Sequence, residues 1–177
     1  MRLVIVDVGL DRQADDPQLI FESRNSTGVD LSQSDLIRNF ILMRLPEKEQ
    51  TQLYESYWSK IEELFRGSEW TFDAFARDFG ALKTQATKEE KADQIYYAFR
   101  EFFPRLREES GSLEGALAEM LRYARYYAAF SLGRGVTEER ARHLARVRHL
   151  VDVPAILVMR LLESCDHVGT LKGRRAS

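Results

Sequence analysis

The sequence predicts a mainly α protein, a helical bundle with one short β-strand at its N-terminal edge. Three observations indicate this fold class. From Pro46 onward, apolar residues recur every three or four positions, which is the period of an amphipathic helix. Residues that cap or break helices separate these apolar segments from one another. Ahead of them, residues 2–10 (RLVIVDVGL) are rich in β-branched side chains and apolar on both faces, as in a short buried strand.

The segment after the strand predicts two helices joined by a polar turn. Residues 16–24 begin with Asp-Pro, a typical N-cap followed by proline at the first helical position. Residues 25–28 (NSTG) supply turn formers, and Gly28 suits a positive φ. Ser32 and Asp35 then have the spacing of a capping box, in which the hydroxyl caps a backbone N–H and the carboxylate reaches back. The helix that follows carries apolar residues at helical spacing: Leu36, Ile37, Phe40 and Ile41.

Six further helices are expected, each bounded by a capping or breaking residue. They run from Pro46 to about Gly67, from Thr71 to Gly80, from Thr87 to the region of Pro104, from Ser112 to Gly133, from Thr137 through Val151, and from Pro154 to about Cys165. In the first of them the apolar face is expected to hold Leu53, Tyr57, Ile61, Leu64 and Phe65. Because proline removes a backbone donor, Pro104 is expected either to kink its helix or to end it near Phe103.

The predicted strand has no convincing partner elsewhere in the sequence. Residues 155–162 form the only other dense apolar run, and Pro154 before them favours the start of a helix. An unpaired apolar strand exposes a row of N–H and C=O groups, which is a template for pairing with a second chain. We therefore expect a homodimer through residues 2–10. The alternative is that a helix covers the strand.

Composition describes an ordinary globular protein with an uneven charge distribution. The 177 residues fit one domain, or a small domain with an appendage, and 44% of them are hydrophobic and 31% charged. The net charge of −2 gives the whole chain no attraction to nucleic acid. Residues 134–177, however, hold 9 Lys and Arg against 5 Asp and Glu, and all three histidines. The C-terminal end is therefore where a nucleic-acid surface is permitted.

Cysteine, histidine and apolar content restrict the compartment and the cofactors. The single cysteine, Cys165, excludes an internal disulfide and a cysteine-based zinc site. His143 and His149 are six positions apart, not the four of a helical metal-binding pair, so no metal site is expected. No run approaches the roughly 18 apolar residues of a membrane helix. We expect a cytoplasmic protein without a membrane partner.

Two basic segments are candidates for a nucleic-acid surface. Arg122 and Arg125 alternate with tyrosines, and rings beside cations hold single-stranded nucleic acid by stacking and phosphate contact. The alternative for this segment is an aromatic core stripe flanked by arginines. Arg142, Arg146 and His149 share one helix face at i, i+4 and i+7, where DNA or an acidic partner would be met. The alternative here is a solvated charged face.

Residues 21–39 carry the most specific pattern of the chain, F-E-x-x-N-x-x-G-x-x-L-S-x-x-D-L-I-R-N. This pattern resembles the motif near the end of the N-terminal domain of GmrSD-type modification-dependent restriction proteins. The resemblance is clear over roughly residues 1–45 and looser over the helical remainder. It implies a nucleotide-binding domain with a ParB/sulfiredoxin-like fold. Intact relatives bind and hydrolyse a nucleotide with magnesium, sense modified or foreign DNA, and cut it with a separate HNH-type nuclease.

The resemblance implies that this chain is a partial member of that family. The family's D-G-Q-Q-R motif is not in the sequence, and no histidine precedes His143 to build a His-Asn-His nuclease. We therefore expect no cofactor and no catalytic residue in this chain. Residues 1–45 would be the remnant of the nucleotide-binding core, and residues 46–177 a helical domain.

Polar residues of the motif are the candidates for ligand contact: Glu22, Asn25, Gly28, Ser32, Asp35, Arg38 and Asn39. Arg38, for example, could hold phosphate or carboxylate with two N–H groups. The alternative is structural, with the turn shaped by Asn25 and Gly28, the helix capped by Ser32 and Asp35, and Arg38 paired with an acid. The expected function is the DNA-sensing or regulatory portion of a restriction or antiphage protein. The alternative function is a non-enzymatic interaction module that dimerises through its N-terminal strand.

Overall fold

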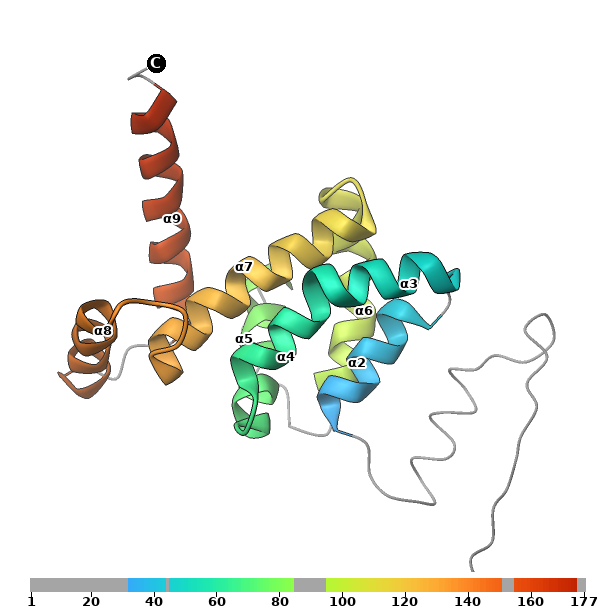
Figure 1. Ribbon diagram of the computed structural model, residues 1–177, viewed down its shortest axis with the longest axis horizontal. Helices are drawn as coiled ribbons and strands as arrows, with labels where there is room; N and C mark the ends of the chain where they lie inside the picture. The colour runs from blue at the N-terminus through green and yellow to red at the C-terminus, as the bar shows by residue number, and fades with distance from the viewer. Residues whose placement is uncertain (1–31, 44, 85–94, 151–154, 175–177) are drawn as a thin grey trace, which may run out of the picture.

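The computed structural model describes residues 32–43, 45–84, 95–150 and 155–174, and these ranges form a helical bundle (Figure 1). The mainly α prediction is thus confirmed, and no strand occurs within the described ranges. The predicted strand at residues 2–10, the helix at 16–24 and the polar turn at 25–28 lie outside them. No helix in this part of the chain has the length and apolar content needed to cross a membrane.

The helices follow the order predicted from the caps and breakers. They are α2 (Gln33–Leu42), α3 (Glu47–Leu53), η1 (Tyr54–Trp58), α4 (Ser59–Phe65), α5 (Glu69–Thr84), α6 (Ile95–Glu109), α7 (Leu113–Leu132), α8 (Glu138–Leu150) and α9 (Ala155–Arg174). Two of the predicted end signals have the expected geometry. Ser112 caps α7 by accepting from the Gly115 N–H at 2.9 Å. Gly133 ends α7 with a φ of 68°, a left-handed conformation that favours glycine.

A π-helical turn, η1, joins α3 and α4 into one continuous helix over residues 47–65, which we call the long helix. The turn changes which residues reach the core. Leu53 and Trp58 are both buried although they are five positions apart, a spacing that an α-helix would turn to different faces. Trp58 therefore replaces the predicted Tyr57 in the centre of the apolar face, and Tyr57 packs at its edge.

The bounds of α5 differ from the prediction at both ends. Thr71 was expected to cap the helix, yet the helix begins at Glu69, and the Thr71 N–H donates to the Ser68 carbonyl at 2.9 Å. Gly80 was expected to end the helix, which instead continues to Thr84. The glycine has a packing role, because a Cβ at residue 80 would lie 3.1 Å from Cε1 of Phe102. A missing side chain thus lets α5 and α6 approach closely.

Two other helix ends lie beyond the positions considered from the sequence. Helix α6 continues through Pro104 to Glu109, so of the two alternatives for Pro104, the one in which the helix ends near Phe103 is wrong. Pro104 is exposed while Leu106 beyond it is buried, and this buried contact holds the last turn in place. Helix α9 runs to Arg174 rather than to about Cys165. A single interior glycine costs only about 1 kcal/mol, too little to end a helix by itself. The capping pair at Thr87 lies outside the described residues.

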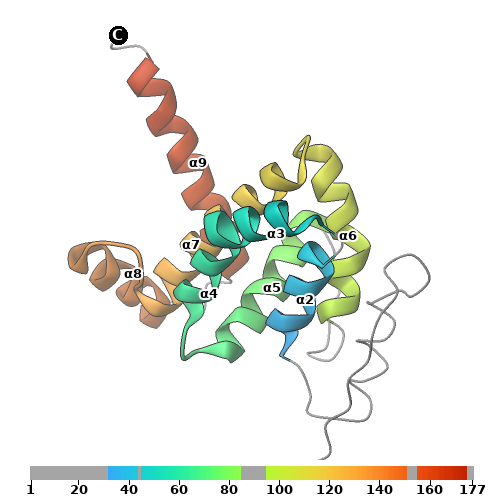
Figure 2. The same cartoon turned by 45° about the vertical axis from the view of Figure 1, so that its right-hand side comes forward.

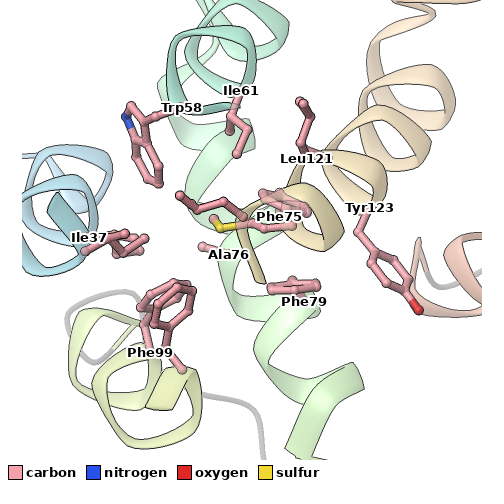
Figure 3. Packing of buried hydrophobic residues seen from close by; sticks show 14 of the residues in the cluster. Ile37, Trp58, Ile61, Phe75, Ala76, Phe79, Phe99, Leu121 and Tyr123 are labelled. Atoms are coloured by element: carbon pink, nitrogen blue, oxygen red, sulfur yellow. The ribbon is translucent and has the colours of Figure 1, made fainter. Parts of the chain in front are cut away.

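Helix α7 crosses the middle of the bundle and packs against α4, α5, α6, α8 and α9 (Figures 1 and 2). Tyr123, Tyr127 and Phe130 of α7 are all buried, so the core stripe considered for this segment is confirmed. The centre of the core is aromatic, and Figure 3 shows its side chains converging from α2, the long helix, α5, α6 and α7. Phe65, Phe75 and Phe79 form a stacked series with ring centroids 5.3 and 5.7 Å apart.

Helix α2 belongs to the same core as the helices that follow it. Ile37 is fully buried and Leu36 nearly so, and both pack in the cluster that holds the residues of α4 to α7. Phe40 meets the rings of Tyr96, Phe99 and Phe103 edge-on at 6.2–6.4 Å. The boundary predicted between residues 45 and 46 therefore falls between two helices that share one core.

Candidate functional site

Three polar residues of the motif lie together at the start of α2. The Ser32 hydroxyl accepts from the Asp35 N–H at 3.1 Å and donates to the Asp35 carboxylate at 2.7 Å. Arg38 then donates to the other oxygen of Asp35 at 2.8 Å. The capping and the acid pairing of the structural alternative are therefore observed for these residues.

Glu62 of α4 completes this arrangement, which we call the Glu62 cluster (Ser32, Asp35, Arg38, Tyr54, Trp58 and Glu62). Its Oε1 accepts from Arg38 at 2.9 Å and from Nε1 of Trp58 at 2.7 Å, and its Oε2 accepts from the Tyr54 hydroxyl at 3.0 Å. The hydrogen bond to Glu62, together with its negative charge, raises the pKa of Tyr54. The cluster fastens α2 to the long helix.

Sequence reasoning missed the partners that Glu62 gathers. Tyr54, Trp58 and Glu62 recur every four positions, and that regular spacing is the signal that could have found them. The acid that Arg38 would pair with was expected but not identified. The Arg38 guanidinium contacts two carboxylates, those of Asp35 and Glu62. These contacts neutralise its charge and leave it poorly placed to hold a phosphate.

The remaining motif positions are only partly described. Asn39 is half-buried on α2, and its carbonyl accepts from the Met43 N–H at 2.9 Å at the end of the helix. Glu22, Asn25 and Gly28 lie outside the described residues, so their contact with a ligand stays a prediction.

A second polar cluster joins α7 to α5 and α9. Arg122 lies 3.7 Å from Glu119 and 3.5 Å from Glu163, and Lys83 also pairs with Glu119. Burial opposes ionisation of Glu163, but the neighbouring Tyr123 hydroxyl and the surrounding cations outweigh it and lower the pKa of this carboxyl. Arg122 thus takes part in ion pairs that join α7 to α9, and its contact with nucleic acid stays a prediction.

Tyr123 lies beneath this cluster with its ring fully buried. Its hydroxyl faces Glu163 but makes no hydrogen bond of normal geometry in the described part of the chain. Burial, aided by the Glu163 charge, raises the pKa of Tyr123 strongly. The side chain therefore acts as a neutral core residue, with Lys83 placed 4.5 Å from the centre of its ring.

The basic helix α8 differs from both clusters. Arg140, Arg142 and Arg146 are exposed, and none of them forms an ion pair within the ranges that the structure describes. Arg125 of α7 is likewise exposed and without an ion pair there. The side chain of His149 lies outside the described set, so its place on the predicted face stays a prediction. Three of the five candidate residues, Arg125, Arg142 and Arg146, are thus accessible to solvent.

Two arginines at the ends of α8 fix its position on the bundle. Arg148 donates to the Phe130 carbonyl at 3.1 Å and to the Ser131 carbonyl at the end of α7. Arg134, just before the helix, donates to the Leu64 and Arg66 carbonyls at 2.8 and 3.0 Å. Both arginines satisfy carbonyls at the ends of other helices. From the sequence alone these arginines are part of a basic segment, and nothing local reveals this anchoring.

In the ranges that the structure describes, no three His, Cys, Asp or Glu side chains gather where they could share a metal ion.

No protein family, curated protein or solved structure matches this chain at a significant level of similarity. The resemblance to GmrSD-type proteins accordingly stays a prediction from the motif.

Proposed function

We propose that this chain is a helical DNA-contacting module of a restriction or antiphage protein, and that α8 carries the contact. The supporting observation is that Arg142 and Arg146 are exposed and form no ion pair with any residue that the structure describes, on a helix held by Arg148 at its end and by Arg134 in the segment before it. They are one turn apart, about 6 Å along the helix axis, on the face that points away from α7.

Contrast with the other candidate cations favours α8. Arg38 and Arg122 each lie between two carboxylates, so moving either one to a phosphate would give up two ion pairs. The α8 arginines have no such partner to lose in the described part of the chain. A guanidinium can engage a phosphate with two N–H groups, so these side chains suit the DNA backbone.

The motif supports the restriction context of this proposal. In this chain Ser32, Asp35 and Arg38 hold α2 in place, and we assign none of them to a nucleotide or to magnesium. The module would position or sense DNA while a separate protein or domain supplies the chemistry. Contacts to phosphate carry no base information by themselves, so selectivity for modified DNA would need further contacts.

Fluorescence anisotropy with a labelled DNA duplex tests the proposal. Binding is expected at about 50 mM salt and should weaken roughly tenfold by about 200 mM if two phosphates are neutralised. The double variant Arg142→Ala and Arg146→Ala should lose that binding and its salt dependence. The matched control removes two exposed arginines of α6, Arg105→Ala and Arg107→Ala, and should bind like the unaltered protein.

Two results would count against DNA binding through α8. One is the same loss of affinity in both double variants, since that reports net charge rather than a site. The other is the absence of binding at about 50 mM salt with both cytosine-modified and unmodified duplexes.

A protein-interaction module is the second candidate function, favoured by the exposed leucines of α9. Leu157 and Leu161 are 50% and 56% exposed on consecutive turns of a helix that extends beyond the bundle (Figures 1 and 2). Dimerisation through residues 2–10 remains part of this candidate. Small-angle scattering of the chain with and without residues 2–10 tests it, and a monomer in both samples would remove that route.

A further inference from the structure

An open groove of about 970 Å³ lies between α2, α3, α6 and the start of α7. Its volume is at the upper end of the range for pockets that hold small ligands, roughly 300–1,000 Å³, and it is open to solvent rather than enclosed. None of the residues assigned to DNA contact or to the Glu62 cluster lines it. The groove is therefore independent of the function proposed above.

The floor of the groove is apolar and rigid. Phe40 and Leu45 present half-buried side chains there, and Pro104 of α6 is exposed beside them. Phe40 is fixed by its edge-on contacts with three neighbouring rings, among them Phe103, whose buried ring also lines the floor. A floor of this kind accepts apolar side chains without rearranging.

Acidic side chains from three helices stand on the rim. Glu49 comes from α3, Glu108 from α6 and Glu114 from α7, and Arg107 is the one cation among the lining residues that the structure describes. Glu114 is held by the Tyr57 hydroxyl, which donates to it at 2.8 Å. Glu49 and Glu108 are exposed and form no ion pair in the ranges that the structure describes.

We propose that this groove docks a cationic amphipathic helix of a partner protein. An apolar face would cover Phe40, Leu45 and Pro104, and Lys or Arg on both flanks would meet Glu49 on one wall and Glu108 on the other. A helix laid into a groove between helices is a recurrent mode of protein recognition. The partner is inferred to be cationic because the described rim carries three carboxylates and one cation.

A labelled synthetic peptide tests the proposal with the full chain. The probe is a helix of about 18 residues, five turns, with leucine on one face and lysine on the other. Fluorescence anisotropy should show saturable binding. A peptide of the same composition with the leucines spread over all faces, and one with glutamate in place of lysine, should each bind at least about tenfold more weakly.

Charge reversal on the rim locates the site. The double variant Glu49→Lys and Glu108→Lys should weaken binding at least about tenfold. The control double variant Glu55→Lys and Glu101→Lys reverses two exposed carboxylates, one on the same long helix and one on α6, that do not line the groove. It should change the affinity less than about twofold. Circular dichroism checks that both variants keep the helical fold.

Three outcomes would overturn the proposal. Equal losses in the two double variants would show attraction by net charge alone. Equal binding of the scrambled peptide would show that the apolar floor has no part. No binding of the amphipathic probe to the full chain would show that the groove takes no such helix, including the case in which another segment of the chain already fills it.

Discussion

Replacing Glu62 by alanine should destabilise the fold more than its half-exposed position suggests. The carboxylate accepts three hydrogen bonds, from Arg38, Trp58 and Tyr54. Trp58 is fully buried, so its indole N–H would be left without an acceptor, a cost of about 1–3 kcal/mol. Arg38 keeps Asp35 and is 31% exposed, so loss of this ion pair adds only about 0.5–1 kcal/mol. The expected loss of unfolding free energy is therefore about 2–4 kcal/mol.

Urea unfolding followed by circular dichroism measures this loss. Glu63→Ala is the matched control, because Glu63 is the exposed neighbour on the same helix and forms no ion pair in the described part of the chain. It should change the stability by less than about 0.5 kcal/mol. Glu62→Gln keeps an acceptor for Trp58 and should cost about 1 kcal/mol. If Glu62→Ala and Glu63→Ala unfold at the same urea concentration, the Glu62 cluster does not hold α2 to the long helix.

Two further predictions concern the core. Burial raises the pKa of both Tyr123 and Tyr127, so the folded state retains their protons when unfolded tyrosines, with a pKa of about 10, release theirs. The contribution to stability is full below about pH 10 and is lost as the pH rises through the higher folded pKa values. After a pH jump to about 11, tyrosinate absorbance from Tyr123 and Tyr127 should rise only as helicity is lost; immediate ionisation of all seven tyrosines with helicity intact would contradict this. In α5, Gly80→Ala should lower the unfolding free energy by about 1 kcal/mol, because overpacking against the buried Phe102 ring outweighs the gain in helix propensity. A variant more stable than the parent would show that the ring yields at little cost.

Local signals in the sequence were sufficient for the caps Ser32 and Ser112 and for the presence of most helices. Ser32 and Ser112 were placed correctly because an N-cap depends on residues within three positions of itself. Arg38 also pairs with Asp35, three positions before it, as the structural alternative required. Such features need no knowledge of the tertiary fold.

Features that depend on a neighbouring helix could not be read in the same way. Gly80 had the form of a helix terminator, and only the Phe102 ring across the interface explains why the helix continues. Arg122 resembled Arg142 in the sequence, yet the acids of α7 and α9 neutralise the first and leave the second exposed. Glu62 was one carboxylate among many until the fold brought Arg38 to it from α2.

The π-helical turn η1 determines which residues of the long helix face the core. A π turn contains one residue more than the α-helix around it needs, which is what a single-residue insertion leaves behind. If residues 47–65 formed a regular α-helix without this turn, the residues before Tyr54 would be rotated by about 100° relative to Trp58. Leu53 would then leave the core and Glu49 the groove rim. The π turn thus keeps both halves of one helix facing their neighbours, and deleting Ser56 would place Leu53 four positions before Trp58, a spacing at which a regular α-helix keeps both on one face.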